Sequence, residues 1–309
     1  MDTLLHLLPK YTLRVVFALL CALLGGLTVS AMAQTPSSTP VVEQGATALL
    51  EKHAALAAQL ASNPYGRPLF LDSSETKTRV SGNAYAMLDS PFSAVSTTFK
   101  SPKRWCDVMM LHLNTKYCMA SSDASPSLLN VNIGKKGVQA LAESYALEFA
   151  FRLVSASPNY LALQLEADKG PMGTSDYKIE LRAVPLPDGK TFIHFRYSYG
   201  YGLAGRLAMQ AYLATLGSGK VGFTQISQGN KPAYIGGTRG IVERNTMRYY
   251  LAIEAYLASL NSPPQQQLST RLEHWFDATE QFPLQLREMD KASYLAMKKI
   301  EYQRLPAVS

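Results

Sequence analysis

Four segments in the middle of the chain alternate apolar and polar residues with a period of two, which predicts β-strands with one buried face. They cover residues 145–154, 160–167, 177–184 and 191–201. Short connections rich in turn-forming residues join them, so we expect an antiparallel meander with one charged, solvated face. The expected apolar face carries Leu147, Phe149, Phe151, Leu153, Leu161, Leu163, Leu165, Tyr177, Ile179, Leu181, Ala183, Ile193, Phe195, Tyr197, Tyr199 and Tyr201.

Helical spacing and shorter apolar runs predict the elements on either side of this meander. The expected strands are residues 78–88, 114–120 and 128–133. The expected helices are residues 44–61, 92–99, a second helix from 102, 203–216, a long helix at 241–260, and a helical tail at 268–305 interrupted by Pro283. A glycine-rich stretch, residues 217–240, separates the last two helices before the tail.

The order of these elements resembles the START-like (SRPBCC) helix-grip superfamily over residues 79–260. Residues 82–92 (Gly-Asn-Ala-Tyr-Ala-Met-Leu-Asp-Ser-Pro-Phe) look like its first strand running into its first helix, and residues 101–105 (Ser-Pro-Lys-Arg-Trp) look like the start of its second helix. The resemblance implies an α+β fold in which a curved antiparallel sheet wraps a long C-terminal helix and leaves a cavity between them. The insertion at 203–240 and the two terminal additions depart from this pattern.

The resemblance implies a ligand between the sheet and the long helix, a hydrophobic small molecule or lipid. The candidate ligand-binding residues are Phe149, Phe151, Leu163, Tyr177, Leu181, Phe195, Tyr197, Tyr199, Arg244 and Arg248. The alternative is that the tyrosines are ordinary core residues, and that the two arginines are solvated or pair with Glu243 and acids of the sheet. The expected lid is the insertion, whose helix carries Leu203, Leu207, Leu213 and Leu216.

The first 33 residues have the three parts of an export signal. A basic start is followed by an uncharged apolar run at 15–29, then by Ala31-Met32-Ala33. We therefore expect cleavage after Ala33 and a periplasmic or secreted mature protein; an uncleaved membrane anchor is the alternative. The expected organisation is a signal peptide 1–33, a disordered leader 34–43, an N-terminal helix 44–64, a helix-grip domain 65–262 with insertion 203–240, and a helical tail 263–309.

Two cysteines, Cys106 and Cys118, remain after cleavage, an even count in an oxidising compartment. We expect a disulfide between them; two buried thiols are the alternative. The formal net charge of +7 comes without a run of Lys or Arg. We therefore expect no nucleic-acid partner, and peripheral contact with an anionic membrane surface stays open.

No motif in the sequence points to a cofactor or a metal, and we expect neither. The histidines show no metal-ligand spacing. Gly217-Ser218-Gly219-Lys220 lacks the first glycine and the final Ser or Thr of a phosphate-binding loop. A fold of this class does not settle function. Two other functions stay open: a cyclase- or hydrolase-type enzyme using Tyr and Arg in the same cavity, and an envelope scaffold with a solid core and a tail that binds a protein partner.

Overall fold

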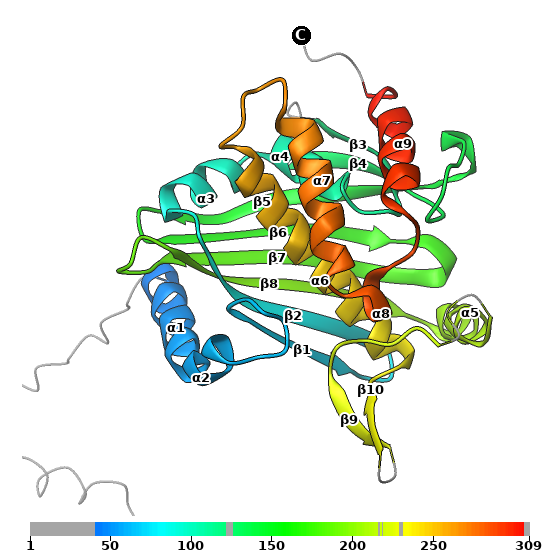
Figure 1. The fold of residues 1–309 in the computed structure, drawn as a ribbon, viewed down its shortest axis with the longest axis horizontal. Helices are drawn as coiled ribbons and strands as arrows, with labels where there is room; N and C mark the ends of the chain where they lie inside the picture. Colours follow the sequence, from blue (N-terminus) through cyan, green and yellow to red (C-terminus); the bar gives the residue numbers. More distant parts are fainter. Residues whose placement is uncertain (1–40, 122–125, 216, 218, 229–230, 306–309) are drawn as a thin grey trace, which may run out of the picture. The chain divides into compact units, whose positions relative to one another are not determined.

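Eight strands form one antiparallel sheet, and this sheet positions the rest of the chain (Figure 1). The computed structural model describes residues 41–121, 126–215, 217, 219–228 and 231–305. In chain order the elements are α1 Val41–Ala55, α2 Ala57–Ala61, β1 Leu69–Glu75, β2 Arg79–Leu88, α3 Phe92–Phe99, α4 Pro102–Met109, β3 Thr115–Ser121, β4 Ser127–Ile133, η1 Leu141–Glu143, β5 Tyr145–Ser157, β6 Tyr160–Lys169, η2 Pro171–Gly173, β7 Thr174–Pro185, β8 Thr191–Tyr201, α5 Leu203–Ala214, β9 Gln225–Gln228, β10 Lys231–Tyr234, α6 Gly237–Ser259, α7 Gln267–Glu280, α8 Pro283–Leu286 and α9 Lys291–Tyr302.

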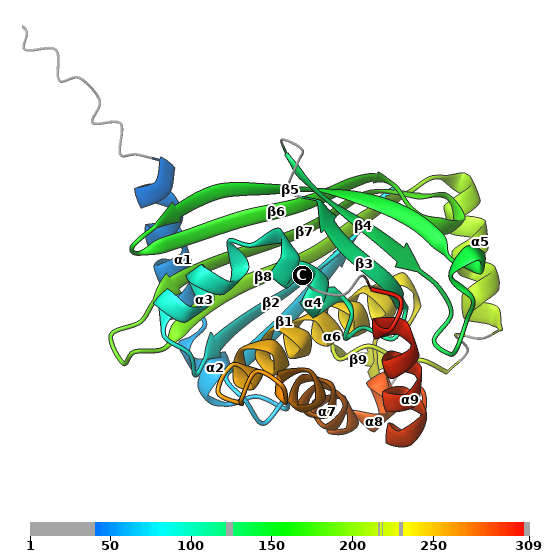
Figure 2. The ribbon, with the colours of Figure 1, turned by 90° about the horizontal axis from the view of Figure 1, so that it is seen from above.

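The strand order across the sheet is β1-β2-β8-β7-β6-β5-β4-β3. The early strand β2 therefore lies beside the last meander strand, with Ala84 opposite Phe195. Figure 2 shows the sheet curving around the long helix α6. The expected α+β helix-grip architecture is thus confirmed, and so is the meander, because β5 to β8 pair in sequence order.

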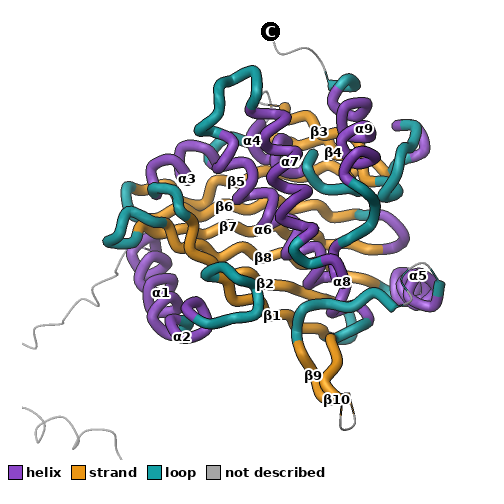
Figure 3. The backbone as a smooth tube through the Cα atoms, in the orientation of Figure 1, coloured by secondary structure: helices purple, strands orange, loops and turns teal. Residues whose placement is uncertain are grey.

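Helix α6 lies against the concave face of the sheet and is buried on nearly every side. Tyr250, Leu251 and Ile253 have no exposed surface. The tail helix α7 packs along the outer side of α6, as Figure 3 shows, and Trp275 donates from Nε1 to the carbonyl of Arg248 at 3.0 Å. The tail therefore belongs to the second layer of helices over the sheet, and it helps to bury α6.

Helix α1 covers part of the opposite, convex face of the sheet. Leu49 and Leu56 pack there with Tyr160 and Phe192 in a small second core. The ring of His53 lies 4.8 Å from that of Phe192, so this histidine packs against the second core. The charged outer positions of β6 to β8 pair across strands, for example Lys178 with Glu166 at 2.7 Å.

A disulfide joins Cys106 of α4 to Cys118 of β3, with 5.1 Å between the Cα atoms. This confirms the expected pairing. Closing a loop of this length stabilises the fold by about 3 kcal/mol in the chain-entropy model. The bond fixes α4 at the edge of the sheet, where the tail helix α9 also packs.

Several boundaries and faces differ from the expectations. Strand β1 and the hairpin β9–β10 were not anticipated, and α6 begins at Gly237 rather than at residue 241. Leu153 is 44% exposed instead of buried, although it pairs in register with the buried Leu163; the register shift of β5 comes only after Leu153.

The expected signal peptide and most of the leader lie outside the described residues, and α1 begins at Val41. Among the residues that the structure describes, no helix has the length and apolar character needed to cross a membrane.

Candidate functional site

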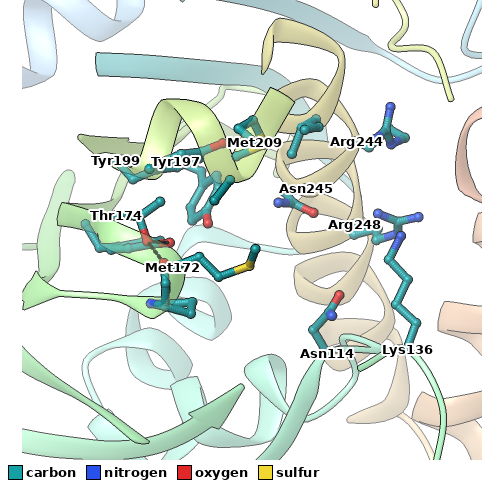
Figure 4. Close-up of a pocket in the computed structure, with 15 residues that line it drawn as sticks. Asn114, Lys136, Met172, Thr174, Tyr197, Tyr199, Met209, Arg244, Asn245 and Arg248 are labelled. Atoms are coloured by element: carbon teal, nitrogen blue, oxygen red, sulfur yellow. Dashed lines mark hydrogen bonds between the residues drawn. The ribbon is translucent and has the colours of Figure 1, made fainter. Parts of the chain in front are cut away.

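A cavity of about 220 Å³ lies between the sheet and α6, at the end of the sheet where α5 and η2 meet the long helix. Figure 4 shows its wall, with tyrosines on one side and cationic side chains on the other. The residues that line it are Asn114, Lys136, Pro171, Met172, Thr174, Tyr177, Tyr197, Tyr199, Gly205, Ala208, Met209, Ile241, Arg244, Asn245 and Arg248.

The tyrosine side of the wall follows directly from strand alternation. Tyr197 and Tyr199 are two residues apart on β8, so both side chains point to the concave face. Tyr177 on the neighbouring strand stacks on Tyr199, with 5.3 Å between the ring centroids. The three rings form a continuous aromatic surface that suits the flat body of an aromatic ligand.

The three phenol groups are neutral hydrogen-bonding groups. Burial raises the pKa of Tyr177, and it raises the pKa values of Tyr197 and Tyr199 far above the usual value. The Tyr177 hydroxyl lies 2.8 Å from Oγ1 of Thr174. The Tyr199 hydroxyl is also buried, yet it has no hydrogen-bond partner among the residues that the structure describes. An unsatisfied buried hydroxyl is costly, and this one belongs to a residue that lines the cavity.

A close backbone contact seats α5 on the turn before β7. Gly173 has a φ of +76°, and a Cβ added at Gly205 would come within 2.7 Å of the Gly173 carbonyl oxygen. Only glycine at position 205 allows this approach. Pro171, Met172 and Thr174 therefore reach the cavity wall opposite α5.

The lid leucines are not placed as expected. Leu203 and Leu207 are 75% and 58% exposed and point away from the cavity, while Ala208 and Met209 of the same helix line it. Leu216 lies outside the described residues. Helix α5 thus forms a wall of the cavity, but through other residues than the leucines.

The cationic side of the wall comes from α6 and from the loop after β4. Arg244 and Arg248 lie one helical turn apart and are almost completely buried. Lys136 donates to Glu288 Oε1 at 2.6 Å, and Arg248 donates to the same oxygen at 2.9 Å. Arg244 donates from Nη1 to the carbonyl of Val221 at 3.1 Å.

Glu288 in the tail is the carboxylate at the centre of this cluster. Lys220 also donates to it, at 3.2 Å from Oε2. Burial alone would raise the pKa of Glu288, but Lys136 and Arg248 outweigh burial and hold it below the usual value. Burial, together with the charge of Arg248, lowers the pKa of Lys136 to about 8. The cluster therefore holds more positive than negative charge at neutral pH.

Glu243, the expected alternative partner of the arginines, anchors a different segment. It accepts from the backbone N–H groups of Phe223 and Thr224 at 2.6 and 2.9 Å, and from the hydroxyl of Ser73 at 2.5 Å. These bonds tie the start of α6 to β1 and to the segment before β9.

A second void of about 80 Å³ adjoins the first and shares five lining residues with it: Asn114, Pro171, Tyr177, Tyr197 and Asn245. Neither void alone reaches about 300 Å³, the lower end of the usual range for ligand pockets, and the two together only just do so. His112 lines the smaller void and is neutral, because burial and then the charge of Arg248 keep its pKa well below 6.5.

The candidate residues divide into three groups. Tyr177, Tyr197, Tyr199, Arg244 and Arg248 lie on the wall of the larger cavity, and Phe149 lines the smaller void. The remaining four are packed core residues that line neither space: Phe151, Leu163, Leu181 and Phe195.

Sequence reasoning did not anticipate Lys136, Asn114 or Glu288. They lie in loops, without periodicity, and they meet α6 only through the tertiary fold. In the described part of the chain, no group of three or more His, Cys, Asp and Glu side chains is placed to hold a metal ion.

No family model matches the chain, and no curated protein matches it either. Solved structures similar to it include a norcoclaurine synthase point mutant of Thalictrum flavum in complex with a transition-state analogue. That structure is 12% identical, with a TM-score of 0.32, and the match covers 48% of this chain and 89% of that chain. Zhui aromatase/cyclase of Streptomyces sp. R1128 has 10% identity, a TM-score of 0.32, and coverage of 47% and 86%. Ara h 8.0201 has 9% identity, a TM-score of 0.34, and coverage of 62% and 99%. At these TM-scores, none of the likenesses supports an assignment of ligand or activity.

Proposed function

We propose that this protein binds a small molecule with an aromatic or other flat apolar body in the cavity between the sheet and α6. The observation that carries the proposal is the buried hydroxyl of Tyr199, a residue that lines the cavity; this hydroxyl lacks a partner in the described part of the chain. A ligand acceptor would satisfy it, and the stacked ring of Tyr177 offers the ligand an apolar surface.

The size of the cavity favours a compact ligand over a long-chain lipid. Its volume of about 220 Å³ lies below the range of roughly 300–1,000 Å³ that is usual for drug-sized ligands. The sequence led us to expect a hydrophobic small molecule or lipid. The cavity volume restricts this class of ligands to molecules of one or two rings.

Titration calorimetry with 2-naphthamide, a neutral two-ring probe with a carbonyl acceptor, tests the proposal. We expect binding to the wild type, and binding weakened about 2- to 10-fold by Tyr199→Phe because one hydrogen bond is lost. Tyr145→Phe is the matched control, since Tyr145 is exposed at the start of β5. Tyr199→Phe should leave the free energy of unfolding unchanged or higher, because the hydroxyl has no partner to lose.

A second pair of variants tests the location. Ala208→Trp fills the cavity from α5 and should abolish binding, whereas Ala211→Trp on the exposed side of the same helix should not. Equal binding by Ala208→Trp and the wild type would place the probe elsewhere and overturn the proposal.

We propose that the protein acts outside the cytoplasm, in the periplasm or as a secreted protein, after cleavage following Ala33. The small-residue pattern Ala31-Met32-Ala33 and the Cys106–Cys118 bond, a cross-link typical of oxidising compartments, support this proposal. Mass spectrometry of the exported protein should find Gln34 as the first residue. A membrane-bound chain that retains Met1 would contradict it.

A further inference from the structure

The cationic side of the cavity wall carries more positive than negative charge, and part of it is buried. Lys136, Arg244 and Arg248 all line the cavity, and Glu288 is the carboxylate that Lys136 and Arg248 share. Lys220 approaches the other oxygen of Glu288. Glu243 is also close along α6, but it already accepts from Ser73 and from two backbone N–H groups. Like charges gathered in a poorly solvated site are costly unless an anion joins them.

Lys136 has unused capacity to donate hydrogen bonds. Its ammonium carries three N–H groups. Glu288 is its one hydrogen-bond partner among the described residues, and its side chain is 26% exposed. The remaining donors are therefore available to a group that enters the cavity.

The two sides of the wall are arranged to suit one amphiphilic molecule. In Figure 4, the tyrosines of β8 lie across the cavity from Lys136 and Arg248, with Asn114 and Asn245 between the two sides. A ring stacked on the tyrosines would direct a substituent toward the cationic side. A carboxylate or phosphate there would accept charge-assisted hydrogen bonds, which are about twice as strong as neutral ones.

We infer that the ligand of this cavity carries an anionic group, a carboxylate or a phosphate, and that Lys136 at the cationic side of the wall binds it. This inference rests on the proposed function and adds the chemical class of the ligand. Lys136 determines the preference for an anion, and the tyrosines bind the ring.

Calorimetry with 2-naphthoate and 2-naphthamide, which share one ring system and differ in charge, tests the inference at pH 7 and low salt. We expect the wild type to bind 2-naphthoate at least about 10-fold more tightly, as a hydrogen bond to a charged group is worth about 1.5–3 kcal/mol. Lys136→Met should remove most of this preference, and Lys136→Arg should keep it. Lys135→Met, an exposed neighbour with the same charge change, is the matched control and should also keep it.

2-Naphthyl phosphate distinguishes the two anions, since tighter binding than 2-naphthoate would identify a phosphate site. Equal binding of 2-naphthoate and 2-naphthamide by the wild type would overturn the inference and leave the proposed function intact. A preference that survives unchanged in Lys136→Met would overturn the role of Lys136. Binding of none of the three probes would overturn the proposed function together with the inference. Urea unfolding of each variant verifies that it is folded.

Discussion

Two clusters of cations, each built around one glutamate of the tail, differ in how completely their hydrogen bonds are made. In the first cluster, Lys116 and Lys298 share Glu301, with 2.8 Å from each Nζ to a carboxylate oxygen. Lys298 also donates to the carbonyls of His112 and Thr115, and Lys116 to those of Leu113 and Gly137. Both lysine side chains are fully buried.

The second cluster, around Glu288, opens onto the cavity. Lys136 donates only to the carboxylate among the described residues, and both Lys136 and Lys220 are partly exposed. The same chemical groups therefore have two different roles. Where backbone carbonyls and the carboxylate together satisfy every ammonium donor, the cluster fixes the tail helix α9 to β3. Where donors remain and a cavity adjoins them, the cluster suits ligand binding.

Removal of the two glutamates gives the largest expected difference between the clusters. Glu301→Gln leaves two buried lysines without a carboxylate, so we expect the free energy of unfolding to fall by about 3–5 kcal/mol. Glu288→Gln should cost about 1 kcal/mol, because two of its three cations reach solvent. Urea unfolding measures the free energy of unfolding of both variants. Equal losses in the two variants would contradict the proposed distinction between the clusters.

A smaller effect is expected from pH. Burial lowers the pKa of Lys298 to about 8, whereas an unfolded chain keeps the ordinary value of about 10.5. Between these values the unfolded chain binds more protons, so this group makes the folded state more stable as pH rises. From pH 8 to 9.5, the wild type should gain at most about 2 kcal/mol relative to Lys298→Met. If the free energy of unfolding changes equally with pH in the two proteins, the pKa of Lys298 is not lowered in the folded state and the prediction is wrong.

The elements of the fold that depend on local pattern were predictable from the sequence. The alternation of β6 to β8 and the apolar periodicity of α6 are properties of contiguous residues, and the disulfide followed from the two cysteines that remain after cleavage, Cys106 and Cys118. They defined the sheet, the cross-link and the long helix, and with them the tyrosine side of the cavity.

The cationic side of the cavity could only be predicted in part. Arg244 and Arg248 stood out as a polar cluster on α6, but Lys136 meets Glu288 across 152 positions of sequence. No local periodicity encodes such a contact. The register shift between Leu153 and Ser155 of β5 was not predictable either, since a bulge leaves no signal in an alternating sequence.

The dependence of the cavity on Glu288 has a consequence for synthesis of the chain on the ribosome. The tyrosines of β8 and the arginines of α6 emerge first, and the carboxylate that Arg248 needs follows 40 residues later. Until Glu288 has been synthesised, the chain carries this cluster of cations with no tail carboxylate to neutralise it. The cationic side of the cavity wall therefore gains its carboxylate only when the tail folds back over α6.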